Sequence, residues 1–208
     1  MTPYNIHEKE FKSAVADLTI ALSTISDQHR DLTELLDSIG DCIPGIVFAK
    51  DTKGRYIYAN DEFVEWIGAA SKDVIHGTTD FYWGSVNRGL KPEQEDFHTF
   101  GAICANSDEV TLKLGRPCIF LEYGAVRGFY QYLHIHKAPL YNYEKKLIGI
   151  VGCGFDVTER ILKQENAYNK LEKIINTSEL KNNNELTEVL LQFREIFDRH
   201  KFTDRTVK

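Results

Sequence analysis

The sequence predicts an α+β fold in which one antiparallel five-stranded sheet carries helices on one face. The first observation is the order of segments: two strand-like segments, a block of helical segments, then three more strand-like segments. The second is hydrophobic periodicity, because long amphipathic helical segments precede and follow this core. We therefore expect an N-terminal coiled-coil-like helix (1–40), a compact domain (41–160), and one or more C-terminal signalling helices (161–208).

The first forty residues carry a stripe of mostly apolar side chains that recur in alternating steps of four and three. Its members are Phe11, Val15, Leu18, Leu22, Ile25, His29, Leu32, Leu36 and Ile39. A repeat of 3.5 residues is typical of helices that pair in a coiled coil, although an amphipathic helix folded back on its own domain is the alternative. Because a soluble monomer seldom exposes such a stripe, we expect a homodimer. We place its seam at Phe11, Val15, Leu18, Leu22, Ile25 and Leu32.

The core segments alternate between short runs of β-branched or aromatic residues and turn residues. The expected strands are 44–51, 55–59, 117–123, 129–139 and 147–155. A short helix after the second strand has Asn60 or Asp61 as its N-cap and Gly68 as its end. Two further helices are expected at 92–104 and 108–114.

The charge balance argues against several classes of function. With 25 basic and 31 acidic residues, the net charge of -6 provides no basic field for phosphate backbones, so we expect no direct binding of nucleic acid. No apolar run approaches the roughly 20 residues that cross a bilayer, and the N-terminus lacks the order of a secretory signal, so the expected location is cytoplasmic. The cysteines lack any C-x-x-C pair and are expected to be reduced thiols: Cys42, Cys104, Cys118 and Cys153.

Motifs of catalysis and metal binding are missing from the sequence. It contains no G-x-S-x-G, no phosphate-binding glycine loop and no H-E-x-x-H, so we expect a protein that is not an enzyme and has no catalytic residues. Tyr130, Tyr132, His134 and His136 alternate on one face of the fourth strand. Two histidines alone do not complete a tetrahedral metal site, so we expect no metal there. This face instead lines either a dimer surface or the rim of a pocket.

Five short motifs follow one another in the compact domain. They are the hairpin from Lys50 to Asn60, Gly77-Thr78-Thr79-Asp80-Phe81, Leu114-Gly115-Arg116-Pro117, Lys137-Ala138-Pro139-Leu140, and Gly149-Ile150-Val151-Gly152 with Asp156-Val157-Thr158-Glu159-Arg160. In this order and spacing, the segment from Asp41 to Arg160 resembles a PAS domain with its C-terminal PAC portion. The resemblance covers about 120 of the 208 residues.

The resemblance implies a sensory module that holds a small organic ligand between sheet and helices and passes its occupancy to flanking helices in a dimer. It implies an output domain or partner protein, such as a kinase, cyclase or DNA-binding module, that is not present in this chain. The candidate ligand-binding residues are Phe63, Trp66, Cys104, Tyr132, His134 and His136. Asp156 and Thr158 are candidates for coupling the domain to the outgoing helix, because their oxygens suit a helix cap. A ligand-free PAS dimerisation or scaffold module is the alternative.

Coloured cofactors are disfavoured, and the cofactor, if any, stays unknown. The reactive-cysteine segment of flavin-binding light sensors is absent from the sequence. Haem-binding relatives carry a histidine on the long helix where this chain has Ile103-Cys104-Ala105-Asn106. A haem-based gas or redox sensor would have to use Cys104, or His98 on the preceding expected helix.

Overall fold

A computed structural model describes residues 29–177, 185–192, 194 and 205–206 of the chain. In this part of the chain a six-stranded antiparallel sheet has the strand order β2-β1-β5-β4-β3-β6. The strands are β1 (Ile46–Asp51), β2 (Tyr56–Ala59), β3 (Cys118–Val126), β4 (Phe129–Tyr141), β5 (Leu147–Asp156) and β6 (Arg205–Thr206). The predicted α+β class and its five strands are confirmed. The sixth strand adds two residues at the free edge of β3.

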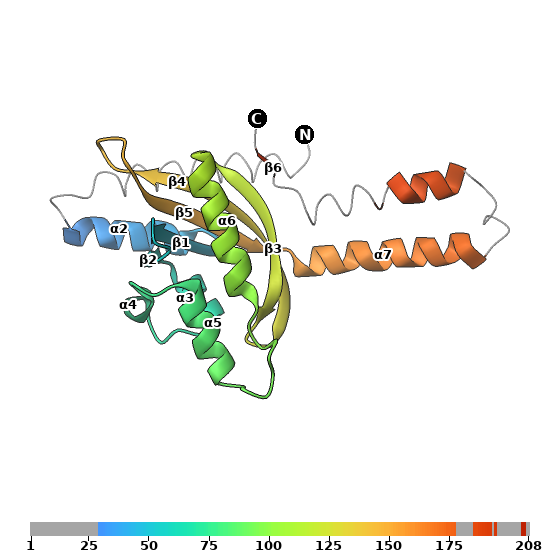
Figure 1. The fold of residues 1–208 in the computed structure, drawn as a ribbon, viewed down its shortest axis with the longest axis horizontal. Helices are drawn as coiled ribbons and strands as arrows, with labels where there is room; N and C mark the ends of the chain where they lie inside the picture. Colours follow the sequence, from blue (N-terminus) through green and yellow to red (C-terminus); the bar gives the residue numbers. More distant parts are fainter. Residues whose placement is uncertain (1–28, 178–184, 193, 195–204, 207–208) are drawn as a thin grey trace.

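Helices cover the two faces of the sheet unequally (Figure 1). One face packs against α3 (Asp61–Ile67), α4 (Lys72–Ile75), α5 (Asp80–Gly89) and α6 (Phe100–Leu114). Their core cluster includes Phe48, Phe63 and Phe100. On the other face, Leu36 of α2 (His29–Cys42) packs against Val47 and Cys153. Because neighbouring strand residues point to opposite faces, Val47 and Phe48 belong to different clusters.

The local signals at α3 act as the sequence predicts. Asn60 is the N-cap, and its side-chain oxygen accepts a hydrogen bond from the Phe63 amide at 3.0 Å. Gly68 ends the helix in the left-handed region with φ 77°. The buried Asn60 amide group also donates to the carbonyls of Gly40 and Gly45, which fixes the end of α2 beside β1. One residue thus joins three elements.

The prediction of two helices at 92–104 and 108–114 is wrong. Residues 92–99 form turns, and α6 is one unbroken helix over the segment that seemed to interrupt it. Ser107 is accommodated in this helix because its hydroxyl lies 3.1 Å from the Ile103 carbonyl and pairs with the Glu122 carboxylate of β3. One turn later, Thr111 donates to the Ser107 carbonyl at 2.8 Å.

The C-terminal part continues as helix. α7 (Thr158–Thr177) leaves the end of β5, and a second helical segment, 185–192, lies beside it (Figure 1). The guanidinium of Arg194 lies 3.9 Å from the Glu172 carboxylate and 6.0 Å from the Tyr168 ring, so the second segment folds back along α7. None of the helices within the described ranges is both long enough and apolar enough to span a membrane. The seam residues Phe11, Val15, Leu18, Leu22 and Ile25 lie outside the described residues, and only the backbone of Leu32, in α2, is described.

Candidate functional site

A small cavity lies between the sheet and the helices. Its volume of about 10 Å³ is room for roughly one water molecule. It is lined by Ile46, Phe48, Lys50, Tyr56, Phe63, Trp66, Asp80, Cys104, Glu122, Leu133 and Ile135. We call it the inner cavity. Its walls combine aromatic rings with charged side chains, an arrangement that an ordinary apolar core lacks.

Strand alternation brings the charged groups to this cavity. Lys50 follows Ile46 and Phe48 on the inward face of β1, and Lys137 follows Leu133 and Ile135 on the inward face of β4. The side chains of both lysines are almost completely buried, with 1% and 0% of their surface exposed. Both ammonium groups therefore need partners inside the fold.

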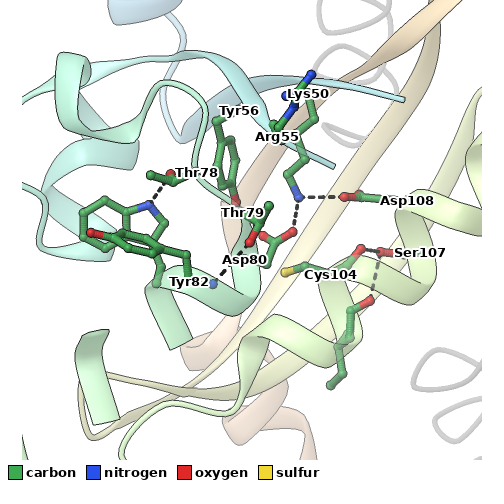
Figure 2. Close-up of polar contacts among 12 residues, drawn as sticks. Lys50, Arg55, Tyr56, Thr78, Thr79, Asp80, Tyr82, Cys104, Ser107 and Asp108 are labelled. Carbon is green, nitrogen blue, oxygen red and sulfur yellow. Dashed lines mark hydrogen bonds and ion pairs between the residues drawn. The ribbon is translucent and has the colours of Figure 1, made fainter. Parts of the chain in front are cut away.

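The Lys50 ammonium bridges two helices (Figure 2). It donates to Asp80, at the start of α5, at 2.5 Å and to Asp108, in the middle of α6, at 2.6 Å. The Tyr56 hydroxyl donates to the second oxygen of Asp80 at 2.5 Å. The Lys50 ammonium also lies 5.1 Å from the centre of the Phe48 ring and 4.7 Å from that of Tyr56, within the range of a cation–π contact.

Lys137 extends the same network toward β3. Its ammonium lies 2.5 Å from Asp108, 2.9 Å from Glu122 and 2.6 Å from the Ser107 hydroxyl. Glu122 Oε1 also accepts a short hydrogen bond from Ser107, and Oε2 accepts one from the Cys104 thiol at 3.2 Å. We call Lys50, Tyr56, Asp80, Cys104, Ser107, Asp108, Glu122 and Lys137 the buried ion cluster. It ties β1, β2, β3 and β4 to α5 and α6.

The electrostatics keep Lys50, Lys137 and Asp108 charged near neutral pH. Burial lowers the pKa of Lys50, but attraction to Asp80 and Asp108 outweighs this and keeps its pKa above the ordinary value. The pKa of Lys137 is likewise raised, because Glu122 and Asp108 outweigh its burial. The two lysines lower the pKa of Asp108 despite its burial. Both ammonium groups and the Asp108 carboxylate are therefore charged.

Burial keeps the two weaker acids of the cluster, the Cys104 thiol and the Tyr56 hydroxyl, in their neutral forms. Burial and the charge of Glu122 raise the pKa of the Cys104 thiol well above its usual range, so the sulfur keeps its proton. Burial and Asp80 raise the pKa of the Tyr56 hydroxyl in the same way. Both groups act as neutral hydrogen-bond donors, and Cys104 is not a reactive thiolate.

Glycines on β5 make room for this arrangement. A Cβ atom at Gly152 would lie 2.3 Å from Cζ of Phe48, and one at Gly154 would lie 2.2 Å from Cδ1 of Ile135. Only a residue without a side chain allows these two inner-cavity side chains to lie flat across the middle of the sheet. Two small residues thus set the position of the cavity wall.

A larger cleft opens on the outer side of the cluster. Its volume is about 240 Å³, and it lies between the β1–β2 turn, the start of α5 and the side of α6. It is lined by Asp51, Thr52, Lys53, Gly54, Thr79, Asp80, Phe81, Ala105, Asp108, Glu109, Leu112 and Ile150. Asp80 lines both spaces. The bridge from Lys50 to Asp80 and Asp108 therefore separates the cleft from the inner cavity.

The structure separates the six predicted ligand-binding residues into two groups. Phe63, Trp66 and Cys104 line the inner cavity. Tyr132, His134 and His136 lie on the opposite face of β4, which corrects the expectation that they face the pocket. The expected alternation is present, but Leu133 and Ile135 form the inward set.

The two candidate coupling residues lie where β5 gives way to α7. The Asp156 carboxylate accepts a hydrogen bond from the Thr158 amide at 2.7 Å. The Thr158 hydroxyl accepts one from the Tyr132 amide at 2.9 Å, and the Val157 amide donates to the Tyr132 carbonyl at 2.8 Å. The first residues of α7 are therefore bound to β4 as well as to β5.

The histidine considered for haem lies away from both spaces. His98 is buried in the turn before α6, where its ring lies 3.3 Å from the amide nitrogen of Asn87, and it lines neither the inner cavity nor the cleft. Burial, with a smaller contribution from Arg88, lowers its pKa to about 4, so the ring is neutral. Among the described residues no group of three or more metal-ligating side chains is suitably placed for a metal ion.

No motif of the sequence predicts the ion cluster. A signal for it is nevertheless present, because Lys50, Glu122 and Lys137 each belong to the inward-facing set of a strand, and the rest of that set is mostly apolar. A charged residue in phase with the apolar set is costly to bury unless it is paired, so it indicates a buried partner. Asp80 belongs to the glycine-threonine-aspartate motif, whereas nothing in the local sequence distinguishes Asp108.

Comparison with solved structures finds several similar chains. VqmA of Vibrio cholerae, solved in a complex with ligand and DNA, is 21% identical, with a TM-score of 0.49, over 62% of this chain and 53% of its own. The PAS domain of BvgS from Bordetella pertussis is 19% identical, with a TM-score of 0.42, over 67% of this chain and 97% of its own. At these identities the likeness concerns the fold alone, and this chain spans little more than half of VqmA. No curated protein matches the chain.

The family comparison is more extensive. The family model for the PAS fold matches residues 41–162, which is more than half of the chain and includes all of β1 to β5, α3 to α6 and the start of α7. The matched segment also contains every residue of the buried ion cluster and both of its neighbouring spaces. The chain therefore belongs to the PAS fold family.

Proposed function

We propose that this chain is a PAS sensor that binds a small organic molecule at the inner cavity and passes its occupancy to α7 within a homodimer. The observation that carries the proposal is the buried ion cluster beside four aromatic rings at the centre of the fold. Replacing buried ion pairs by apolar residues is often neutral or stabilising, so stability alone does not explain the cluster. A ligand-recognition site would explain the cluster, because such a site needs polar groups fixed in an apolar cavity.

The route of the signal follows from the strands. β4 carries Lys137 of the cluster and, five residues earlier, Tyr132, whose backbone binds the start of α7. A ligand that shifts the cluster also shifts β4, and we propose that α7 follows this movement. We further propose that the signal passes from α7 to an output domain or partner protein in the cytoplasm, and that the PAS domain itself acts by binding and not by catalysis or direct contact with nucleic acid.

A second candidate function is a ligand-free scaffold, and the small volume of the inner cavity favours it. Room for about one water means that a ligand must displace side chains, whereas a scaffold needs no such movement. Native mass spectrometry of the purified full chain separates the two. The sensor retains a small molecule that is lost on denaturation, and the scaffold shows the bare chain with no retained mass.

A matched pair of variants makes the test specific to the cavity. Leu133→Phe adds a ring at the cavity wall and should abolish the retained mass. Leu162→Phe makes the same change at an exposed position of α7 and should leave it unchanged. A bare chain in the unaltered protein, or a mass that survives Leu133→Phe, contradicts binding at this cavity.

The dimer has its own test. Leu18→Asp combined with Leu22→Asp places charges on the seam predicted from the heptad pattern and should produce monomers in analytical ultracentrifugation at micromolar concentration. A matched double substitution at two polar positions, Ser23→Asp with Thr24→Asp, should leave the dimer intact. A double seam variant that sediments like the unaltered protein excludes this seam as the interface.

A further inference from the structure

The buried ion cluster carries more negative than positive groups. Across the described ranges, every buried acidic or basic side chain other than the neutral His98 belongs to it: two lysines and three carboxylates. With all five groups counted as ionised, the formal charge is minus one, and none of the five exposes more than 8% of its side chain. An unbalanced charge in such surroundings is costly, and a positive partner relieves the cost.

The unbalanced charge can be assigned to one atom. Asp80 and Asp108 each receive strong donors on both oxygens, from Lys50, Lys137 and Tyr56. Glu122 differs, because Oε1 takes Lys137 and Ser107, whereas among the described residues Oε2 receives a hydrogen bond only from the Cys104 thiol. A thiol is a weak donor. Glu122 and Cys104 both line the inner cavity, so the least satisfied oxygen of the cluster belongs to a cavity wall.

The aromatic walls of the inner cavity are suited to a positive charge. Phe63 lies between neighbouring rings, with centroid distances of 5.9 Å to Phe48, 5.0 Å to Tyr56 and 5.6 Å to Trp66. Ring faces attract cations, and two of these rings already hold the ammonium of Lys50. Aromatic rings and a carboxylate that line the same cavity form a site that favours ammonium over a neutral or anionic group.

We infer that the ligand of the proposed sensor, on whose existence this inference rests, is a small organic ammonium ion with a compact apolar body. Its N–H groups pair with Glu122 Oε2, and its body lies among the aromatic rings. The cleft of about 240 Å³ is the route by which the ligand reaches the inner cavity. The bridge of Lys50 to Asp80 and Asp108 must open for the ligand to pass.

Three probes of the same size and shape test the charge preference directly. Benzylammonium, benzyl alcohol and benzoate share a phenyl ring and differ in the charge of the attached group. Binding is measured at pH 7 and constant ionic strength by calorimetry and by thermal shift of the full chain. We expect benzylammonium to bind roughly tenfold or more tightly than benzyl alcohol, the ratio that one charge-assisted hydrogen bond gives, and benzoate not to bind.

Two variants assign the preference to one atom. Glu122→Gln should remove the tenfold advantage of benzylammonium while binding of benzyl alcohol persists. Glu109→Gln removes a carboxylate that lines only the cleft and should leave the advantage intact. If Glu122→Gln does not fold, the order of the three probes on the unaltered protein still decides the matter.

Each outcome has a defined meaning. Benzoate or benzyl alcohol binding as tightly as benzylammonium overturns the inference and leaves the sensor proposal in place. If no probe binds, the inference is overturned as well, and a retained molecule in native mass spectrometry then decides whether the sensor proposal survives. A persistent ammonium preference in Glu122→Gln excludes pairing with Glu122.

Discussion

Two lysines, each surrounded by acidic groups, differ strongly in their access to water and give the sharpest test of the buried ion cluster. Lys137 has none of its side chain exposed and contacts Asp108 and Glu122. Lys72, at the start of α4, contacts three carboxylates of Asp37, Asp41 and Asp61 at 3.0–3.2 Å, with 26% of its side chain exposed. Substitution by Met keeps most of the length of each side chain and removes its charge.

The expected losses of stability differ several-fold. Lys137→Met leaves Asp108 and Glu122 buried without their shared cation, and breaking a buried pair in this way costs about 3–5 kcal/mol. Lys72→Met removes ion pairs that water screens, so the loss should be about 1 kcal/mol although the number of partners is larger. Urea unfolding followed by circular dichroism gives both values, provided that the slope of the transition stays unchanged.

A double variant identifies the cause of the loss. If the uncompensated carboxylate is responsible, Lys137→Met combined with Glu122→Gln should be more stable than Lys137→Met alone, with a coupling energy of about 1–3 kcal/mol. Equal losses in the two lysine variants would refute the burial argument. So would a double variant whose loss equals the sum of the two single losses.

Three further predictions concern other parts of the fold. Gly152→Ala should lower the free energy of unfolding by about 1–3 kcal/mol, because the new methyl group would lie 2.3 Å from the Phe48 ring. Gly89→Ala, where no atom lies within 4 Å of the new methyl group, should leave it unchanged, and thermal unfolding compares the two variants. Because the pKa of buried His98 is about 4, below its unfolded value of 6.5, the unfolded chain binds a proton first as the pH falls. The free energy of unfolding should therefore decrease as the pH falls from 6.5 to 4, by about 1 kcal/mol at pH 5 after allowance for solvent screening. Urea titrations at several pH values should show a weaker dependence of this free energy on pH for His98→Gln. Equal dependence in the two proteins would contradict the lowered pKa of His98. Asp156→Ala removes the acceptor for the Thr158 amide and should lower the free energy of unfolding by about 1 kcal/mol without changing ligand affinity. A large loss of affinity at unchanged stability would show that Asp156 does more than cap α7.

The features that the sequence predicts well are local. The strand segments, the Asn60 cap and the Gly68 end each depend on residues within a few positions of one another, so periodicity and capping chemistry identify them. The single helix α6 was not predicted, because the sequence at Ala105, Asn106 and Ser107 indicates a break between two helices. In the structure the Ser107 hydroxyl lies near the Ile103 and Cys104 carbonyls of the same helix and pairs with Glu122 of β3, a partner that local sequence does not reveal.

The site was only partly predictable because it depends on pairings between distant residues. Lys50 and Asp108 are 58 positions apart, and only the packing of α6 across the sheet brings them together. Alternation along β4 separates two sets of residues but does not say which set faces the helices. The tyrosines and histidines seemed better suited to a ligand, yet the set that contains Leu133, Ile135 and Lys137 is the buried one. A set of alternate strand residues that is mostly apolar but includes one charged residue was therefore the better indication of the buried face.

The position of the cluster supports the proposal that one site serves both recognition and signalling. Asp80 and Asp108 belong to helices, and Lys50 and Lys137 belong to strands, so their ion pairs cross between the two layers, whereas the pair of Lys137 with Glu122 joins two strands. A new positive charge at Glu122 would weaken the hold of this carboxylate on Lys137, because two cations would then share one acceptor. Lys137 would turn toward Asp108 and change the spacing between β4 and α6. The same strand binds the first turn of α7 through Tyr132, so a change in charge at the cavity reaches the helix through one continuous element.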